Sequence, residues 1–425
     1  MNIGPIEIES KQQTRSLRLK EAVFASFHEP APSIRARLGE FASRDWERAK
    51  DWLDISGLAL YFLDRLVTLN LENCIPALFL NQLQTNLADN RKRADSLFDE
   101  ILLLTRALQQ RNINCCVLKG VTLPPESVPD IALRNQTDLD LLVRESDAES
   151  TKECLAEFGY RLTAVSGSTW EFKAGPSGTA SLKNLYQVRP ERAVDIQLIA
   201  DSGAALKSDR LTRTHLRSIR GHEVPALSPA DIFVLQGQHL FKHICSEHTR
   251  GSWLLEYWRH VCARRNDAAF WDEVQLIAEQ EPGSDIAIGA TTLLASLFFG
   301  PFAPQELSPW SMDRLPPAVC LWIQLYGRRV LMSDTPFSKL YLLLRKELNG
   351  NSPEEYVARR RLIFPLHRPP RITRAVGEEG VYTRLRRYRR EAQFVIQRLC
   401  FHIAEGVGLA IESLRWQRRL GGVSQ

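Results

Sequence analysis

The sequence predicts an α+β protein in which a small mixed β-sheet core is flanked by helical N-terminal and C-terminal regions. Three observations support this fold class. Apolar residues recur at three- and four-residue steps before residue 112 and again in the second half of the chain, as in amphipathic helices. Between these regions, short apolar and β-branched runs alternate with turn residues, which indicates strands. A helical stretch at residues 147–158 interrupts those runs, so the core contains both element types.

Residues 1–111 are predicted to form a helical N-terminal region. Its spacing is clearest near the end, where one stripe contains Ala94, Phe98, Ile101, Leu102, Thr105 and Leu108. The pattern changes at Asn112, so residues 112–200 are predicted to be the α+β core. Strands are expected at residues 115–120, 138–143, 161–165, 169–175, 182–188 and 193–199.

Residues 201–362 are predicted to form a helical C-terminal domain. Ser228 is a suitable N-cap and Pro229 suits the first position of a helix. Helices are expected at residues 231–247, 252–265, 267–280, 286–299, 316–330 and 337–348. A Pro-rich stretch at 364–374 predicts a break, so residues 363–425 are predicted to be a separate Arg-rich helical tail.

Composition excludes several protein classes. The 425 residues are 44% hydrophobic and 25% charged, and a chain of this length is expected to form two or three packed units. The eight cysteines include no CxxC pair, so neither a zinc ribbon nor a secreted disulfide framework is expected. The longest apolar run, residues 293–299, is far shorter than the roughly 20 residues that span a bilayer. The sequence therefore predicts a cytoplasmic protein without a transmembrane segment.

Two carboxylates lie one residue apart in the apolar segment Asp138-Leu139-Asp140-Leu141-Leu142-Val143. Because side chains alternate along a strand, Asp138 and Asp140 are expected on the same face. Like charges this close repel each other unless a cation lies between them. Mg²⁺ binds one or two carboxylates together with water and substrate phosphates, so the pair predicts a magnesium site.

A third carboxylate, Asp195, lies among apolar residues of the predicted strand at 193–199. A neighbouring strand would place it beside Asp138 and Asp140. Three carboxylates can hold two divalent ions, one that activates an attacking oxygen and one that binds a triphosphate and stabilises the departing pyrophosphate. The three residues are therefore the predicted catalytic and metal-binding set for nucleotidyl transfer.

Two cationic side chains and a glycine are predicted to bind the phosphates. Lys119 and Gly120 end the first predicted strand, where glycine permits close approach of the backbone and lysine supplies a positive charge. Arg134, four residues before Asp138, is suited to a bidentate contact with phosphate.

Together these motifs resemble the uncharacterised nucleotidyltransferase family of the polymerase-β-like nucleotidyltransferase superfamily. The resemblance covers roughly residues 95–260 and rests on a strand ending in LKG, an arginine four residues before DLDLLV, and a later VDIQL. It implies that Asp138 and Asp140 are metal ligands, and that Asp195 is the third ligand or the base. It further implies that the nucleotide phosphates contact Lys119, Gly120 and Arg134.

The resemblance implies an enzyme that uses Mg²⁺ and transfers a nucleoside monophosphate from an NTP such as ATP to an acceptor. The acceptor is open: a natural-product peptide, an RNA end or a protein hydroxyl. Two features depart from the family pattern, namely the eighteen-position gap from Gly120 to Asp138 and Gln197, where members often carry histidine. The alternative is a non-catalytic nucleotide-sensing or RNA-binding protein on a degenerate nucleotidyltransferase fold.

The predicted helices after the sheet carry further residues of this resemblance. His239 and His243 are expected on one helix face, and Glu256 lies where family members often have aspartate. Without an HExxH pattern the histidine pair is interpreted as structural rather than as a zinc site. Trp253 and Trp258 are interpreted as core residues.

The Arg-rich tail is a candidate contact surface. Residues 351–425 contain 15 Arg, no Lys and 7 Glu, a net charge of +8. Clustered arginines can bind nucleic-acid phosphates, although they also form the solvated face of many helices. An amphipathic face on an anionic membrane is a third interpretation. The predicted nucleic-acid contacts are Arg359, Arg360, Arg361, Arg384, Arg386, Arg387, Arg389 and Arg390.

Overall fold

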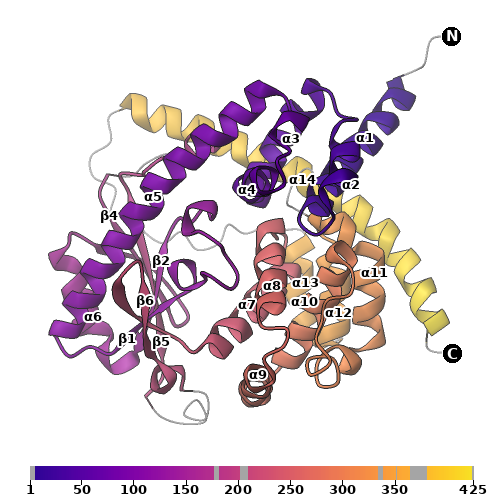
Figure 1. Ribbon diagram of the computed structural model, residues 1–425. Helices are drawn as coiled ribbons and strands as arrows, with labels where there is room; N and C mark the ends of the chain where they lie inside the picture. Colours follow the sequence, from indigo (N-terminus) through magenta and orange to yellow (C-terminus); the bar gives the residue numbers. More distant parts are fainter. Residues whose placement is uncertain are drawn as a thin grey trace.

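A computed structural model of the protein describes residues 5–176, 181–201, 209–333, 338–350, 352–363 and 381–423. Helices lie at both ends of this part of the chain, and one mixed sheet lies between them, so the predicted α+β class is confirmed. Figure 1 shows α5 and α6 on one side of the sheet and the C-terminal helices on the other.

The N-terminal region is helical, as predicted. Its helices are α1 (Pro5–Ser26), α2 (Ala31–Leu38), α3 (Ser43–Ser56), α4 (Ala59–Leu69) and the long α5 (Ala77–Gln110). The predicted stripe near the end of α5 is buried, because it packs against the sheet.

Within the described residues, seven strands form one sheet in the order β3-β4-β5-β2-β1-β7-β6. Strand β2 lies antiparallel to β1 and parallel to β5, and β1 lies parallel to β7. The strand bounds are β1 (Cys115–Leu118), β2 (Leu139–Arg144), β3 (Arg161–Ser166), β4 (Thr169–Ala174), β5 (Arg192–Ile199), β6 (His215–Ile219) and β7 (His222–Ala226). The predicted helix at 147–158 is α6 (Ala148–Glu157).

The strand predicted at residues 182–188 is wrong. Its first residues form a short 3₁₀ helix, Leu182–Asn184. The side chain of Tyr186 is buried, and its hydroxyl donates a 2.7 Å hydrogen bond to Asp54 of α3. The carbonyl of Leu185 accepts a hydrogen bond from Arg93 of α5. The apolar residues of this segment therefore anchor a loop to the N-terminal helices.

Two strands that the sequence analysis did not identify, β6 and β7, extend the sheet beyond residue 200. Val117 of β1 pairs with Ala226 of β7. The side chains of β6 are largely exposed, and β7 contains Pro225, so neither strand has the apolar alternation that indicates a half-buried strand.

The two faces of the sheet contact different parts of the protein. Val117, Leu141 and Ile196 pack in one core cluster with α5 and α6. Leu118 and Leu142 point the other way and join the large core formed by the N-terminal and C-terminal helices. Because side chains alternate, residues next to Leu141 and Ile196 on their strands face the C-terminal helices.

The C-terminal helices lie where the sequence predicts them: α7 (Pro229–Ile244), α8 (Gly251–Ala263), α9 (Ala268–Gln280), α10 (Ser284–Phe299), α11 (Pro317–Leu331) and α12 (Tyr341–Asn349). The Ser228 side chain accepts a 3.1 Å hydrogen bond from the backbone N–H of Asp231, which confirms it as the N-cap of α7. Two more helices follow, α13 (Pro353–Ile363) and α14 (Val381–Val423). The predicted break at 364–374 lies outside the described residues.

The N-terminal and C-terminal helices share one hydrophobic core. The rings of Phe24 in α1 and Phe298 in α10 lie 4.5 Å apart, and the buried Lys20 donates a 2.7 Å hydrogen bond to the Met332 carbonyl. The helical regions are therefore separate in sequence but packed together in space. None of the described helices combines the length and the apolar character needed to cross a bilayer.

Candidate active site

The site begins at the turn that ends β1. Lys119 has φ +55° and ψ −164°, a backbone conformation that is essentially restricted to glycine. Gly120 follows with φ +52°, and a Cβ at this position would lie 2.2 Å from the Gln136 side chain. Two successive positive φ angles reverse the chain sharply, and they place the Lys119 side chain over the end of the sheet. Strain of this kind in a non-glycine residue is concentrated at functional sites.

The predicted carboxylates lie at the same end of the sheet as this turn, since Leu118 at the end of β1 pairs with Asp140 of β2. In the parallel pair of β2 and β5, Asp140 lies directly opposite Asp195. Both side chains point toward the C-terminal helices, because the alternate residues Leu141 and Ile196 point toward α5. Asp138 comes just before β2 and is half-buried, whereas Asp140 is buried. The expectation that a neighbouring strand brings Asp195 beside Asp140 agrees with this register.

Lys119 joins the carboxylates. Its Nζ lies 3.1 Å from Oδ1 of Asp140, and this oxygen also accepts a 3.4 Å hydrogen bond from the Gln197 amide. Burial raises the pKa of Asp140, while the Lys119 charge opposes the rise and the Asp138 charge adds to it. Burial also raises the pKa of Asp195 to about 6, and the Asp138 and Asp140 charges contribute in the same direction.

These carboxylates fit a divalent cation by their chemistry. Among the described residues, Asp195 and Oδ2 of Asp140 accept no hydrogen bond from a protein group. Their mutual repulsion is relieved when a cation binds, and carboxylate oxygens are the ligands that Mg²⁺ prefers. Across the part of the chain that the structure describes, no three His, Cys, Asp or Glu side chains are already arranged as a metal site. Asp138, Asp140 and Asp195 remain the predicted ligands.

Arg134 lies beside this group and is held by a buried carboxylate. Its Nε lies 3.3 Å from both oxygens of Glu256 in α8. The Tyr61 hydroxyl of α4 donates a 2.9 Å hydrogen bond to the same carboxylate. Burial acts to lower the pKa of Arg134, but the charge and hydrogen bond of Glu256, together with the Tyr61 and Asp138 charges, outweigh it and raise this pKa, so the guanidinium stays charged. Because Glu256 binds only Nε, the two terminal nitrogens are directed away from it.

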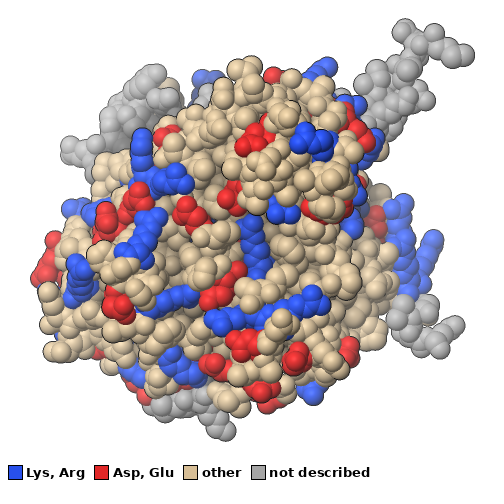
Figure 2. Space-filling model, viewed as in Figure 1, with Lys and Arg blue, Asp and Glu red and all other residues tan. Residues whose placement is uncertain are grey.

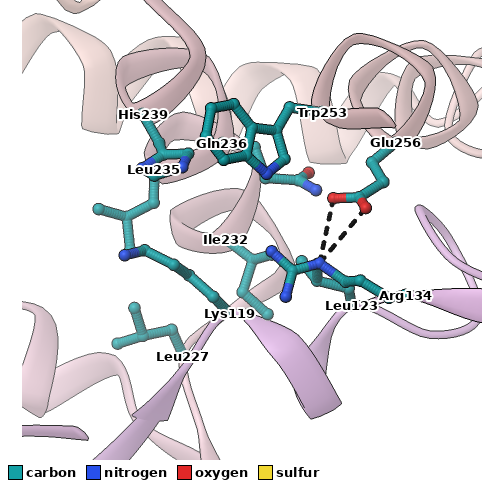
Figure 3. A pocket seen from close by; sticks show the side chains of 10 residues that line it. All are labelled: Lys119, Leu123, Arg134, Leu227, Ile232, Leu235, Gln236, His239, Trp253 and Glu256. Atoms are coloured by element: carbon teal, nitrogen blue, oxygen red, sulfur yellow. Dashed lines mark hydrogen bonds and ion pairs between the residues drawn. The ribbon is translucent and has the colours of Figure 1, made fainter. Parts of the chain in front are cut away.

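A cavity opens between the end of β1 and helices α7 and α8. It is lined by Lys119, Leu123, Arg134, Leu227, Ile232, Leu235, Gln236, His239, Trp253 and Glu256. Figure 3 shows the Lys119 and Arg134 side chains approaching this space from the sheet, with His239 and Trp253 on the opposite side. Its wall is thus mostly apolar, with two cations on one side.

Comparison with known proteins identifies the family. The family described as "Uncharacterised nucleotidyltransferase" matches residues 42–300, which include α3 to α10 and the whole sheet. This chain belongs to that nucleotidyltransferase family.

One solved structure with a related description is that of an antigenic nucleotidyltransferase-like protein from Paracoccidioides brasiliensis. It is 13% identical to this chain, with a TM-score of 0.29, over 46% of this chain and 92% of its own. A TM-score this low carries no inference about the site. No curated protein matches the sequence significantly.

Within this nucleotidyltransferase, His239 and His243 lie side by side with ring centroids 4.6 Å apart. The Trp253 ring lies 4.8 Å from His239 and 4.3 Å from His243. Burial, with a contribution from the nearby Lys119 charge, lowers the pKa of His239 to about 2, and burial also lowers the pKa of His243. The pair is therefore neutral near pH 7. Trp253 and Trp258 are partly buried and pack against the large hydrophobic core, so their interpretation as core residues is confirmed. Trp253 also lines the cavity, and Trp258 stacks on Phe299 with centroids 4.6 Å apart.

Two arginines near the candidate site had no role in the sequence analysis. The Arg250 guanidinium lies 5.3 Å above the Trp253 ring, and its buried Nε has no hydrogen-bond partner among the described residues. Burial lowers the pKa of Arg250, and the Arg134 charge adds to this effect. Burial also lowers the pKa of Arg93 to about 10. The one sequence signal that could have pointed to these arginines is the position of Arg250 shortly before Trp253.

The structure places the predicted nucleic-acid arginines on α13 and α14, outside the region matched by the nucleotidyltransferase family. Arg359 and Arg360 line a second cavity between α12, α13 and α14. Arg361 and Arg389 are exposed, while the side chains of Arg384, Arg386, Arg387 and Arg390 lie outside the described part. Figure 2 shows basic and acidic side chains interspersed on the face that contains the sheet.

Proposed function

We propose that this protein is a Mg²⁺-dependent enzyme that transfers a nucleoside monophosphate from an NTP to an acceptor hydroxyl and releases pyrophosphate. The observation that carries the proposal is the register of β2 and β5, which aligns Asp140 with Asp195 beside Lys119. Carboxylates and cationic side chains lie together in one group. A metal-bound triphosphate requires both, because carboxylates bind the metal and cationic side chains bind the phosphates. The family match supports the reaction class.

Each side chain has a role in this proposal. Asp138, Asp140 and Asp195 hold the metal, and Asp195 is also placed to accept the proton of the acceptor hydroxyl. When bound, Mg²⁺ polarises the phosphate oxygens and stabilises the charge that develops on the leaving group. Lys119 and the terminal nitrogens of Arg134 bind phosphate oxygens, and Gly120 allows the backbone to approach them closely.

Gln197 has a place in this site although the family often carries histidine there. Its amide donates to Oδ1 of Asp140, so it orients the carboxylate from the neighbouring strand. The departure is therefore compatible with an intact metal-binding edge. The proposed acceptor is a natural-product peptide, an RNA end or a protein hydroxyl, and ATP is included among the proposed donors. A protein that senses nucleotides without turnover is the alternative.

The test measures binding of each of the four NTPs by calorimetry, with and without Mg²⁺. The wild type is compared with Asp138→Asn/Asp140→Asn, and the matched control is Asp99→Asn/Asp272→Asn, which changes two exposed carboxylates on α5 and α9. We expect Mg²⁺-dependent binding that the first double variant loses and the control retains. Binding that survives in Asp138→Asn/Asp140→Asn would contradict the proposed site.

Turnover is tested separately with an NTP that carries the label on its α-phosphate. Transfer of the label to an acceptor together with pyrophosphate release supports the enzyme. Mg²⁺-dependent binding without label transfer to a peptide, RNA or protein acceptor supports the nucleotide-sensing alternative.

A further inference from the structure

The outward face of α14 is apolar over a long stretch. Among the described side chains from Val395 to Leu414, ten are exposed, and all ten are apolar when alanine and cysteine are included. The six larger ones at helical spacing are 49–64% exposed: Ile396, Leu399, Ile403, Val407, Ile411 and Leu414. We call these ten residues the α14 apolar face. Contiguous exposed apolar surface of this kind marks a site of interaction.

The opposite side of α14 is attached to the protein. Leu409 and Trp416 are buried, and the Trp416 indole donates a 3.1 Å hydrogen bond to Glu347 of α12. Glu405 accepts a hydrogen bond from the backbone of Lys339, and Glu412 accepts one from the Tyr326 hydroxyl. The helix is thus held in one orientation, and its apolar face is directed outward. Figure 1 shows α14 at the periphery of the helical region.

The charges at the two ends of this face are positive. Arg389 is exposed before it, and Arg415, Arg418 and Arg419 are exposed after it. The helix as a whole contains nine Arg and three Glu, a net charge of +6. Of its described acidic residues, Glu405 and Glu412 both face the protein body. The surface that α14 presents to a partner therefore combines an apolar centre with cationic ends.

We propose that the α14 apolar face docks on an anionic lipid surface. With about 3.6 residues per turn, the ten exposed residues occupy about half of the helix circumference. A contact with a single partner helix needs a narrower seam. A helix that lies in a bilayer interface buries a wide apolar face, and its arginines contact the anionic headgroups.

Two other partners fit less well. A second copy of the chain in an antiparallel pair centred near Ile403 would bring Arg389 beside the second copy's Arg418, and a parallel pair would align identical arginines. Both arrangements bring like charges together. An RNA would contact the arginines through its phosphates but would leave the apolar centre without a partner.

The test is co-sedimentation of the full chain with vesicles of equal parts phosphatidylglycerol and phosphatidylcholine, and with vesicles of phosphatidylcholine alone. The variants are Leu399→Ser/Ile403→Ser and Ile411→Ser/Leu414→Ser. The control, Leu78→Ser/Leu276→Ser, removes two exposed leucines from α5 and α9. All substituted side chains are exposed, and thermal unfolding verifies that each variant remains folded.

We expect the wild type to bind the anionic vesicles and not the neutral ones. Each α14 double variant loses at least about tenfold in affinity, since two large apolar groups no longer enter the interface. The control binds like the wild type, and Arg415→Gln/Arg418→Gln binds more weakly.

Three results would overturn the proposal. One is vesicle binding that is equal in the α14 variants and the control. Another is a concentration-dependent dimer in analytical ultracentrifugation that Leu399→Ser/Ile403→Ser abolishes, without vesicle binding by the wild type. The third is binding to RNA but not to anionic vesicles.

Discussion

The Tyr61 hydroxyl donates a 2.9 Å hydrogen bond to Oε1 of Glu256, and both residues are buried. The same carboxylate lies 3.3 Å from Nε of Arg134. Helix α4, helix α8 and the segment before β2 therefore meet at a single charged group. The orientation of Arg134 depends on both helical regions, although the residue itself belongs to the sheet core.

These contacts predict that removing the Glu256 carboxylate lowers the free energy of unfolding more than removing the Tyr61 hydroxyl does. Glu256→Ala leaves the Arg134 charge buried and unpaired, so we expect a loss of about 3–5 kcal/mol in the free energy of unfolding. Tyr61→Phe removes one hydrogen bond to a carboxylate that keeps its ion pair, and we expect a loss of about 1 kcal/mol. Urea denaturation measures both values. Equal losses would show that Glu256 does not balance the Arg134 charge.

Backbone strain at Lys119 predicts a difference between two variants that both remove its ammonium. Lys119→Ala keeps a side chain at φ +55°, whereas Lys119→Gly relieves strain of about 1–3 kcal/mol. Glycine also makes the unfolded chain more flexible, which offsets about 0.4–1 kcal/mol. We therefore expect the glycine variant to be more stable by about 1 kcal/mol in urea denaturation. In the proposed function, both variants bind Mg-NTP more weakly than the wild type.

If Lys119→Ala proved at least as stable as Lys119→Gly, the strain would have no energetic consequence. If either variant bound Mg-NTP like the wild type, Lys119 would not contact phosphate.

His260 predicts a loss of stability in mild acid. Its Nδ1 lies 2.7 Å from the Gln236 side chain and 3.2 Å from the Ser127 hydroxyl, and burial lowers its pKa to about 3. The unfolded chain, with an ordinary histidine pKa near 6.5, then binds a proton that the folded chain excludes. The stabilising contribution is present above pH 6.5 and is lost as the pH falls from 6.5 toward 3. The expected slope from this residue reaches about 1.4 kcal/mol per pH unit.

The measurement is the free energy of unfolding between pH 7 and pH 5 for the wild type and His260→Gln. We expect the variant to have the shallower slope, whatever its stability at pH 7. His215→Gln, on an exposed strand residue, is the control and keeps the wild-type slope. Parallel curves for the wild type and His260→Gln would contradict the prediction.

Two helix glycines predict opposite outcomes for one substitution. A Cβ on Gly289 in α10 would lie 2.7 Å from the backbone carbonyl oxygen of Ser311, which cannot move without its chain. Gly289→Ala is therefore expected to destabilise the protein by about 1–3 kcal/mol. A Cβ on Gly408 in α14 meets nothing within 4 Å, so Gly408→Ala is expected to stabilise by about 0.5–1 kcal/mol. Thermal unfolding of the two variants measures both signs, and a shared sign would contradict this account.

The helices were predictable because their apolar faces are buried against large partners. The stripe in α5 and the N-cap at Ser228 are local signals, and both have the expected place in the structure. The segment around Tyr186 carries an apolar pattern whose partner, Asp54, lies 132 residues earlier. Strand β6 at the sheet edge buries none of its side chains fully, and the three consecutive buried residues of β7 include Pro225, so neither sequence has the alternation that identifies a strand.

In the candidate site, too, local features were predictable from the sequence and contacts between distant residues were not. The prediction that Asp195 lies near Asp140 needed only strand alternation and one neighbouring strand, and their register agrees with it. The partner of Arg134 could not be predicted, because Glu256 comes 122 residues later on a helix whose orientation depends on the whole core. The same applies to the position of Arg250 over Trp253 at the cavity.

The contact between Tyr61 and Glu256 spans 195 residues, and it has a consequence for synthesis on the ribosome. Tyr61, Lys119 and Asp140 leave the ribosome well before α8. Strand β1 has no partner on one side until β7 has been synthesised. A nascent chain that ends before Glu256 holds Arg134 without its counter-charge. Contacts between residues this distant in sequence form slowly, and the surfaces awaiting them stay exposed in the meantime. We therefore expect the growing chain to be most prone to aggregation before α8 has emerged.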